Sequence, residues 1–356
     1  MARSTPLQLE VHDVAFGGKG VARHEGKVYF VPFTIPGEKI SAQVVRQKKN
    51  FGEAELLGVE TASPDRVAPP CPYFGRCGGC SYQHIAYDRQ LAIKAAQVEQ
   101  TLRRVGRLEN VPMRPIVGAP HPYGYRNRIR VHCAGGVTGF FAYDARALVD
   151  VEQCLLAVPE VNRALRRLRG TRTEEGDYSL RAPGGGPYFE QTNPEMAALL
   201  VEAVRATVQG KETLIDAYCG AGLFARALAD RFKKVVGIEA NTAAVESARR
   251  SAQPHESYIA GEVGAHLGEV LTLHDSTQTT VLVDPPSEGL TPRVCDQLLA
   301  GGPAEIVYVS CNPATLARDI AALSGGYALL AVTPLDMFPQ TAEIEVVAHL
   351  VRGASA

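Results

Sequence analysis

A short apolar strand that runs into a glycine loop most strongly limits the folds available to this chain. The strand, Thr213–Asp216, ends in an acid, and Gly220 and Gly222 follow it before a helical stretch. Further apolar strands alternate with helical segments beyond residue 189, and they are Val235–Glu239, Thr280–Asp284, Ile306–Val309 and Glu345–Val351. Such alternation predicts a doubly wound parallel sheet over residues 189–356, with ligands at the carboxyl ends of the strands.

The glycine loop indicates a site for a nucleoside-type cofactor. Glycines let the backbone approach a ligand closely. Glu239, at the end of the next strand, is placed to accept hydrogen bonds from ribose hydroxyls. The complete G-x-G-x-x-G pattern of dinucleotide sites is absent, because Phe224 and Ala225 follow Leu223. The loop therefore favours S-adenosylmethionine over a dinucleotide.

Asp284 is followed by two prolines, which make a rigid bend at the end of its strand. The bend would project polar groups over the reactive end of the cofactor. In amine methyltransferases an aromatic residue usually follows such prolines, whereas Ser287 follows here. An amine methyltransferase is therefore the less favoured interpretation.

Cys311 is the candidate nucleophile. It follows the apolar strand 306–309, so it should lie exposed at the carboxyl end of that strand. An ordinary thiol pKa of about 8.5 would have to be lowered locally, and a buried structural cysteine is the alternative. For a general base, the chain offers Glu343 and Glu345, of which only one is expected to face the site. Periodicity alone does not choose between them.

The N-terminal part, residues 1–62, predicts a small OB-like β-barrel. Its short strands are separated by glycine turns, and they are Leu7–Val11, Lys27–Val31, Lys39–Val45 and Glu53–Leu57, with turns at Gly17–Gly20 and Ile35–Gly37. Residues 63–188 predict a central α+β domain, with a helix over Tyr87–Val105 and arginine-rich strands after it. With residues 189–356, the chain is expected to form three domains.

Charge is distributed unevenly along the chain. The net charge of −1 does not by itself indicate a nucleic-acid partner. Seven arginines nevertheless lie between Leu102 and Arg130, against one acid. Among them, Arg126, Arg128 and Arg130 alternate, which predicts that they project from one side of a strand. Guanidinium groups suit phosphate oxygens, so this strand is a candidate RNA contact.

Eight cysteines in a chain without a secretion signal argue against a disulfide framework. Cys71, Cys77 and Cys80 crowd together, and with Cys154 they could hold a metal by thiolate ligation alone. Their spacing leaves tetrahedral zinc and an iron–sulfur cluster equally open. The remaining three are expected to be small packing residues, and they are Cys133, Cys219 and Cys295. No apolar run reaches the roughly 20 residues of a membrane helix, so a cytoplasmic protein is expected.

Several segments together resemble the RNA uracil-C5 methyltransferase family, in the branch with an N-terminal TRAM domain and an iron–sulfur cluster. The resemblance covers nearly the whole chain. It is carried by Cys71–His84, Tyr125–Asn127, Gln191–Pro194, Asp216–Gly222, Asp284–Pro286, Tyr308–Asp319 and Asp336–Pro339. It implies a multidomain α/β protein with a TRAM barrel, a central α+β domain with an iron–sulfur site and a C-terminal Rossmann-like methyltransferase domain.

The resemblance also implies roles for single residues. Cys311 matches the nucleophile and Glu345 the general base, while Glu343 stands where the family has histidine. The residues that match the S-adenosylmethionine site are Gln191, Tyr218, Glu239 and Asp284. Those that match the [4Fe–4S] ligands are Cys71, Cys77, Cys80 and Cys154. Two departures are Ser287-Glu288 in place of a basic pair, and Leu223 in place of a polar residue.

The expected activity is therefore methylation of uridine C5 in RNA, through a covalent bond between Cys311 and C6 of the base. Ribosomal 23S RNA is the first expected substrate, and a transfer RNA T-loop uridine is the alternative. The barrel should grip RNA, and the target base should be flipped out toward Cys311. A monomer is expected. A non-catalytic iron–sulfur RNA-binding protein is the other alternative.

Overall fold

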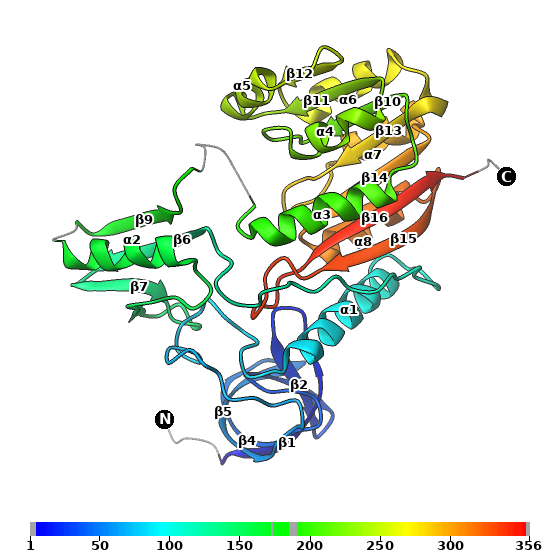
Figure 1. The fold of residues 1–356 in the computed structure, drawn as a ribbon. Helices are drawn as coiled ribbons and strands as arrows, with labels where there is room; N and C mark the ends of the chain where they lie inside the picture. Colours follow the sequence, from blue (N-terminus) through cyan, green and yellow to red (C-terminus); the bar gives the residue numbers. More distant parts are fainter. Residues whose placement is uncertain (1–4, 172–173, 185–190, 354–356) are drawn as a thin grey trace. The chain divides into compact units, whose positions relative to one another are not determined.

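The computed structural model describes residues 5–171, 174–184 and 191–353 (Figure 1). Contacts within the chain define two compact units. The first takes the chain up to Gln97, with Pro120–Pro183 and Phe338–Glu343; the second takes Val98–Ala119, Gly184–Met337 and the chain from Ile344 onward. The division into domains at 1–62, 63–188 and 189–356 stays a prediction, and its second boundary lies outside the described residues.

Five strands at the start of the first unit close into a barrel in the order β1-β2-β3-β5-β4. They are β1 (Leu7–Val14), β2 (Lys19–His24), β3 (Lys27–Pro32), β4 (Lys39–Gln47) and β5 (Phe51–Thr61). Alternate apolar side chains such as Val11, Val31 and Ile40 fill the interior, as period-two patterning requires. The expected barrel is confirmed, but β2 was missed. Its Gly20 looked like part of a turn, whereas a Cβ there would lie 1.9 Å from Oγ1 of Thr34.

The rest of the first unit is α+β, as expected. An antiparallel sheet has the order β8-β7-β6-β9. Its strands are β6 (Arg128–Ala134), β7 (Val137–Phe141), β8 (Leu148–Asp150) and β9 (Gly176–Arg181). Helix α2 (Pro159–Gly170) packs on this sheet through Val161 and Leu165, which join Ile129 and Val131 in one core. Helix α1 (Tyr87–Arg104) begins in the first unit, and its last turns belong to the second.

The second unit is built on a seven-stranded sheet with the order β12-β11-β10-β13-β14-β16-β15. The strands are β10 (Thr213–Ala217), β11 (Lys234–Glu239), β12 (Glu256–Ala260), β13 (Thr279–Val283), β14 (Glu305–Ser310), β15 (Tyr327–Leu335) and β16 (Glu345–Arg352). β10 pairs in parallel with both β11 and β13, so the strand order reverses there. Ligands of open α/β sheets bind outside the carboxyl ends of strands at such a reversal.

The expectation of an all-parallel sheet is wrong at β16, the only reversed strand of this sheet among the described residues. β16 runs antiparallel to both β14 and β15. The chain passes from β15 to β16 through a short irregular segment without a helix, and a parallel pair needs a longer crossover. The start of β16 therefore lies at the edge of the sheet where β14 ends.

Helices cover the sheet on both faces (Figure 1). They are α3 (Pro194–Thr207), α4 (Leu223–Leu228), α5 (Thr242–Arg250), α6 (Val263–Thr272), α7 (Pro292–Gly301) and α8 (Pro313–Leu323), with short 3₁₀ turns at Ala229–Arg231 and Ser276–Gln278. Local sequence sets several starts: Asn193, Thr291 and Asn312 cap α3, α7 and α8 with their side chains, and proline follows each. Among the described residues, no helix is long and apolar enough to cross a membrane.

Candidate active site

Asp216, at the end of β10, directly precedes the glycine loop and bonds to the helix that follows it. Its side chain is fully buried. Oδ2 accepts a hydrogen bond from the backbone N–H of Ala225 at 2.8 Å, whereas Oδ1 has no partner among the described residues. Burial, with the Asp284 and Glu239 carboxyls nearby, raises the pKa of Asp216 to about 8. A buried oxygen without a donor beside a glycine loop fits a site that a polar ligand completes.

The glycine loop turns back on Glu239, the last residue of β11. Oε2 of Glu239 accepts from the N–H of Gly220 at 3.1 Å, and Oε1 accepts from the N–H of Asn241 at 2.7 Å. The backbone is left-handed at Gly220 and Gly222, with φ of 54° and 82°, and also at Tyr218, with φ of 67°. Such a backbone is strained for tyrosine, and strain of this kind is concentrated at functional sites. The structure thus brings Tyr218 and Glu239 to one loop.

Asp284 follows β13, the strand beside β10. Its backbone N–H lies 3.4 Å from the carbonyl oxygen of Ala217, so the residue sits beside the start of the glycine loop. The residue is half-buried, and desolvation of its carboxyl raises the pKa of Asp284 to about 7. Asp216, Glu239 and Asp284 therefore mark the ends of three neighbouring strands, as expected for a ligand site at this edge.

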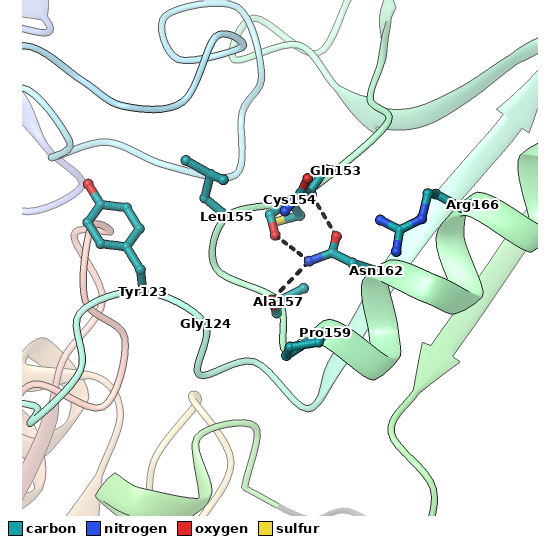
Figure 2. A pocket seen from close by; sticks show the side chains of 9 residues that line it. All are labelled: Tyr123, Gly124, Gln153, Cys154, Leu155, Ala157, Pro159, Asn162 and Arg166. Carbon is teal, nitrogen blue, oxygen red and sulfur yellow. Dashed lines mark hydrogen bonds between the residues drawn. The ribbon is translucent and has the colours of Figure 1, made fainter.

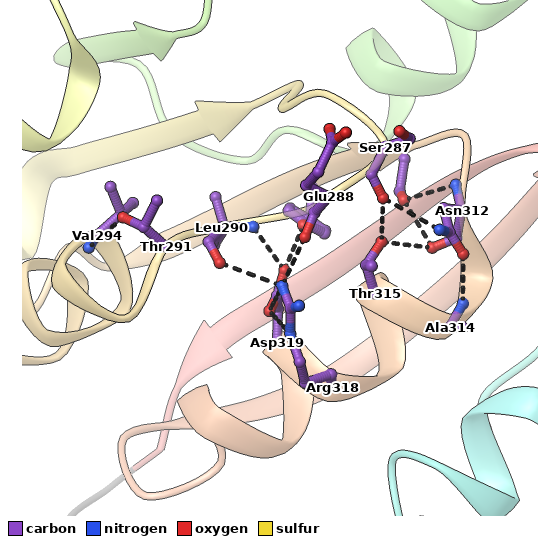
Figure 3. Close-up of polar contacts among 12 residues, drawn as sticks. Ser287, Glu288, Leu290, Thr291, Val294, Asn312, Ala314, Thr315, Arg318 and Asp319 are labelled. Atoms are coloured by element: carbon purple, nitrogen blue, oxygen red, sulfur yellow. Dashed lines mark hydrogen bonds and ion pairs between the residues drawn. The ribbon is translucent and has the colours of Figure 1, made fainter.

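Residues 287–290, after the two prolines, lie against α8 (Figure 3). The carbonyl oxygen of Ser287 accepts from Nδ2 of Asn312 and from Oγ1 of Thr315, each at 3.0 Å. The side chains of Ser287 and Glu288 are exposed. The departure from a basic pair therefore places a hydroxyl and a carboxylate on the surface of this loop.

Cys311 lies just beyond the end of β14, and it is exposed, as the sequence predicted. The neighbouring turn is fixed by short bonds: the hydroxyl of Ser310 accepts from the N–H of Asn312 at 3.1 Å, and Asn312 caps α8 through the N–H of Ala314 at 3.0 Å. The candidate nucleophile therefore sits on an ordered turn between a strand and a helix.

Glu345 is the first residue of β16, and only 4% of it is exposed, whereas Glu343 is exposed. Residues two apart in a strand share a face, so this difference does not come from alternation: Glu343 precedes β16, whereas Glu345 is part of it. The β14–β16 ladder ends with Ser310 opposite Val346. The next position of the same register brings Cys311 and Glu345 opposite each other. Gln191 lies in the segment before α3.

The four cysteines expected to hold a cluster line one cavity of about 230 Å³ in the first unit. Nε2 of Gln83 donates to Sγ of Cys80 at 3.1 Å, and the N–H of Gly79 donates to Sγ of Cys77 at 3.5 Å. Burial raises the pKa of Cys80 to about 12 and also raises those of Cys77 and Cys154. Thiol donors that share one cavity fit the chemistry of a thiolate-ligated cluster.

That arrangement does not amount to a metal site as it stands. Within the part of the chain that the structure describes, no group of three or more histidine, cysteine or acidic side chains is arranged to hold a metal ion. The expected iron–sulfur site is therefore not shown. The other three cysteines, Cys133, Cys219 and Cys295, are buried, as expected for packing residues.

Asn162 fixes the loop that carries Cys154 (Figure 2), and the sequence did not single it out. Its Oδ1 accepts from the N–H of Cys154 at 2.9 Å, and its Nδ2 donates to the carbonyl oxygens of Cys154 and Ala157 at 2.9 and 3.0 Å. The same loop borders an open pocket of about 380 Å³, to which Tyr123 and Arg166 also contribute. An asparagine next to Val161 and three residues before Leu165, in an otherwise arginine-rich helix, is the sequence signal that could have indicated this role.

The arginine strand differs from the expectation. Only Arg128 and Arg130 belong to β6. Arg130 is paired with Asp177 at 2.5 Å. Arg126 precedes the strand and is half-buried, with its guanidinium 5.8 Å from the ring centre of Phe338. The prediction that all three project from one side of a strand is therefore wrong for Arg126, because that segment is held by a bridge to Ala157 instead.

The barrel carries a basic and aromatic surface, called the barrel patch here, formed by Phe30, Arg46, Lys48, Lys49 and Phe51. The Phe30 and Phe51 rings meet edge to face with centres 5.7 Å apart, and Nζ of Lys48 lies 5.5 Å from the centre of the Phe51 ring. All three cations are exposed: Lys48 and Lys49 lie in the β4–β5 turn, and Arg46 lies near the end of β4, 3.7 Å from the Glu53 carboxylate. Cations beside aromatic rings are the usual elements of a single-stranded RNA surface.

Comparison with known proteins assigns the family. The model of the tRNA (uracil-5-)-methyltransferase family matches residues 183–257 and 265–353, and that of the TRAM domain matches residues 7–57. An uncharacterized RNA methyltransferase from Listeria monocytogenes is 30% identical, over 98% of both chains. The chain belongs to the RNA (uracil-5-)-methyltransferase family. A second relative, an uncharacterized RNA methyltransferase from Halalkalibacterium halodurans, is also 30% identical, over 97% of this chain and 96% of its own.

A solved structure agrees with this assignment to the RNA methyltransferases. The Pyrococcus abyssi tRNA (uracil-54, C5)-methyltransferase, crystallised with S-adenosyl-L-homocysteine, matches with a TM-score of 0.73 and 25% identity. The match covers 97% of this chain and all of that one. The family and the TRAM domain recognised from sequence motifs are thus confirmed, and the seven-stranded unit has the fold of S-adenosylmethionine-dependent methyltransferases.

Proposed function

We propose that this methyltransferase transfers a methyl group from S-adenosylmethionine to C5 of a uridine in RNA, with Cys311 as the nucleophile and Glu345 as the general base. The observation that carries the proposal is the register of β14 and β16. It gives an exposed thiol and a buried carboxyl neighbouring positions at the sheet edge that also holds Asp216, Glu239 and Asp284. Group transfer needs a nucleophile, a base and a cofactor site together.

The residues proposed to bind the cofactor are Gln191, Tyr218, Glu239 and Asp284. S-adenosylmethionine supplies an electrophilic methyl group on its sulfonium. Glu239 keeps lone pairs for ribose hydroxyls, since each of its oxygens accepts one backbone N–H in the structure. Oδ1 of Asp216, which has no partner among the described residues, offers a further hydrogen-bonding group beneath the loop. Asp284 would orient the reactive end of the ligand from the adjacent strand.

The chemistry follows from the weak nucleophilicity of uracil C5. The Cys311 thiolate adds to C6, and the electron pair of the C5–C6 double bond moves to C5, which takes the methyl group. Glu345 then removes the C5 proton; the pair left behind restores the double bond as the C6–sulfur bond breaks. The thiolate is thereby regenerated and the base leaves as neutral 5-methyluracil, with the C5 proton on Glu345 and the sulfonium converted to the neutral thioether S-adenosylhomocysteine. The N-terminus of α8, which begins just after Cys311, favours the thiolate form.

The expected substrate remains a uridine of 23S ribosomal RNA, on the motifs of the branch that this chain resembles. A transfer RNA T-loop uridine is the second candidate. The specific observation in its favour is the likeness over nearly the whole chain to the Pyrococcus abyssi tRNA enzyme. The barrel patch would hold single-stranded RNA in either case. Cytoplasmic location and a monomeric state stay expectations.

An iron–sulfur cluster held by Cys71, Cys77, Cys80 and Cys154 is also proposed, on the strength of the shared cavity. The cluster would serve structure or RNA docking. Anaerobic incubation with iron and sulfide should give the visible absorbance of a thiolate-ligated iron–sulfur cluster in the wild type and much less of it in Cys77→Ala. Zinc bound in place of iron, at one ion per chain, would support the tetrahedral alternative.

The proposed reaction is tested with RNA that contains 5-fluorouridine, incubated with the protein and S-adenosylmethionine. Fluorine cannot leave C5 as a proton does, so a covalent RNA–protein adduct should survive denaturing electrophoresis and map to Cys311. Adduct yields with ribosomal and transfer RNA then identify the substrate. No adduct with either RNA, although the cofactor binds, would favour an amine methyltransferase or a non-catalytic RNA-binding protein.

A further inference from the structure

Asp319 of α8 holds together three parts of the site that are distant in sequence, and the proposed mechanism does not use it. Only 2% of the residue is exposed. Its Oδ2 accepts from the hydroxyl of Tyr308 and from the N–H of Leu290, both at 2.7 Å, and its Oδ1 accepts from Nε of Arg318 at 2.8 Å (Figure 3). One carboxylate thus joins β14, the loop after Asp284 and α8.

Arg318 extends the same network along the loop. Its Nη2 donates to the carbonyl oxygens of Glu288 at 2.8 Å and Leu290 at 3.1 Å. With the two bonds that Asn312 and Thr315 make to Ser287, side chains of α8 and its cap hold the carbonyls of Ser287, Glu288 and Leu290. A segment without helix or strand bonds is therefore fixed almost entirely by one helix.

The approach of this loop to Asp319 is very close. Gly289 has φ of 77°, and a Cβ there would lie 2.4 Å from Oδ2 of Asp319 and 2.7 Å from Nη2 of Arg318. Only glycine fits such an approach. Burial and the Asp319 carboxylate together raise the pKa of Tyr308, so its hydroxyl stays protonated and donates. Close packing against Gly289 and hydrogen bonding to Tyr308 therefore both fix the position of the Asp319 carboxylate.

We propose that Asp319 is a positioning residue of the methyl-transfer reaction. Its hydrogen bonds link Tyr308, three residues before Cys311, to the loop that begins at Asp284. They thereby fix the position of the Cys311 thiol relative to the proposed cofactor site. The inference rests on the proposed function of Cys311. A reacting pair that is displaced by about 1 Å loses on the order of a hundredfold in rate, so the network matters for the reaction even though it touches neither reactant.

The test is the rate of adduct formation with 5-fluorouridine RNA, measured for wild type and Asp319→Asn well below the melting temperature of each. An amide nitrogen donates, so it would face one of the three donors that the carboxylate accepts. We expect adduct formation to slow by about 10- to 100-fold, with S-adenosylmethionine affinity within about threefold of wild type. Asp296→Asn, an exposed carboxyl on the neighbouring α7, should react at the wild-type rate.

The outcomes separate the two proposals. If wild type forms no adduct, the proposed function fails before Asp319 is considered. If wild type reacts and Asp319→Asn reacts equally fast while only its melting temperature falls, Asp319 is merely structural and the inference is overturned. Should Asp319→Asn not fold, Tyr308→Phe removes one donor and keeps the charge. It should slow the adduct by about three- to tenfold, and an unchanged rate would overturn the inference.

Discussion

Cys311 directly follows, and Glu345 directly precedes, the last residue pair that links β14 to β16. The ladder runs from Glu305 opposite Val351 to Ser310 opposite Val346, so the next step pairs the exposed thiol with the buried carboxyl. Because β16 is antiparallel to β14, its first residue lies at the edge where β14 ends. Strand pairing thereby brings two chemically useful residues to the same edge of the sheet, although 33 residues of chain separate them.

Replacing the thiol should separate binding from chemistry. Cys311→Ala removes the proposed nucleophile at an exposed position. We expect methyl transfer to fall below detection, while affinities for RNA and S-adenosylmethionine stay within about threefold of wild type. Tritium transfer from labelled cofactor measures methyl transfer, and filter binding measures the affinities. Cys295→Ala, at a buried packing cysteine, is the matched control and should keep its activity. Activity retained in Cys311→Ala would favour an amine target.

Substitution of the two candidate glutamates should identify the general base. Glu345→Gln should stall elimination after methyl transfer, because an amide cannot take the C5 proton, so a covalent complex with ordinary RNA should accumulate. Glu343→Gln is the control, since that side chain is exposed. Denaturing electrophoresis with unmodified RNA measures both variants. The reverse result, with an adduct only in Glu343→Gln, would show that the base has been assigned to the wrong residue.

The buried pair of Glu305 and His349 should stabilise the sheet at neutral pH. Glu305 accepts from Nε2 of His349 at 2.9 Å, Oγ1 of Thr280 at 2.7 Å and the N–H of Gly210 at 2.7 Å. Burial would raise the pKa of Glu305, but these bonds outweigh it and lower the pKa. Glu305→Gln should cost about 3–5 kcal/mol in the free energy of unfolding at pH 7.

The same pair gives a pH dependence with a definite sign. A lowered folded-state pKa means that the stabilisation is present above the ordinary value of 4.5 and is lost as the pH falls through the lower value. The difference between wild type and Glu305→Gln in urea unfolding should therefore shrink below about pH 4. Glu269→Gln, at an exposed position of α6, should match wild type throughout. A difference that grows on acidification would contradict the assignment.

Asp216 should give the free energy of unfolding the opposite pH dependence from that of Glu305. Its folded-state pKa of about 8 lies above the ordinary 3.8, so the folded protein binds this proton more tightly than the unfolded chain. Stability should therefore fall as the pH rises between these values. Asp216→Asn cannot titrate, and its unfolding free energy should change less over about pH 5–8. Asp296→Asn serves as the exposed control, and parallel profiles for wild type and Asp216→Asn would refute the prediction.

The barrel patch should contribute to RNA affinity through charge and stacking. Removing two cations, in Lys48→Ala/Lys49→Ala, should weaken binding and reduce the slope of log affinity against log salt by roughly 1 to 1.5. Phe51→Ala should cost about 1–3 kcal/mol in binding free energy if a base stacks there. Lys233 is a cation outside the barrel patch, and its ammonium pairs with Glu212 at 2.7 Å. Lys233→Ala is therefore the matched control and should keep the wild-type salt slope. An unchanged salt slope in the double variant would exclude the barrel patch from the RNA contact.

Much of the site was predictable from sequence, because its signals are local. Apolar strands that end in Asp216, Glu239 and Asp284 placed three acids at one sheet edge, and the exposure of Cys311 followed from the strand before it. The barrel was predicted from its alternating strands, except for β2. That strand was missed because Gly20 is required by the nearby Thr34 side chain, a contact between residues 14 positions apart in the chain.

The sequence by itself determined the family, the glycine loop, the strand ends and the exposed thiol, since each depends on short-range pattern or on a motif. The tertiary structure alone decided that β16 inserts antiparallel beside β14, which buries Glu345, exposes Glu343 and sets the former opposite Cys311. It also decided the role of Asp319, whose partners Tyr308 and Leu290 lie 11 and 29 residues away. Hydrogen bonds across such distances leave no periodic signal in a sequence, because they depend on how strands and helices pack.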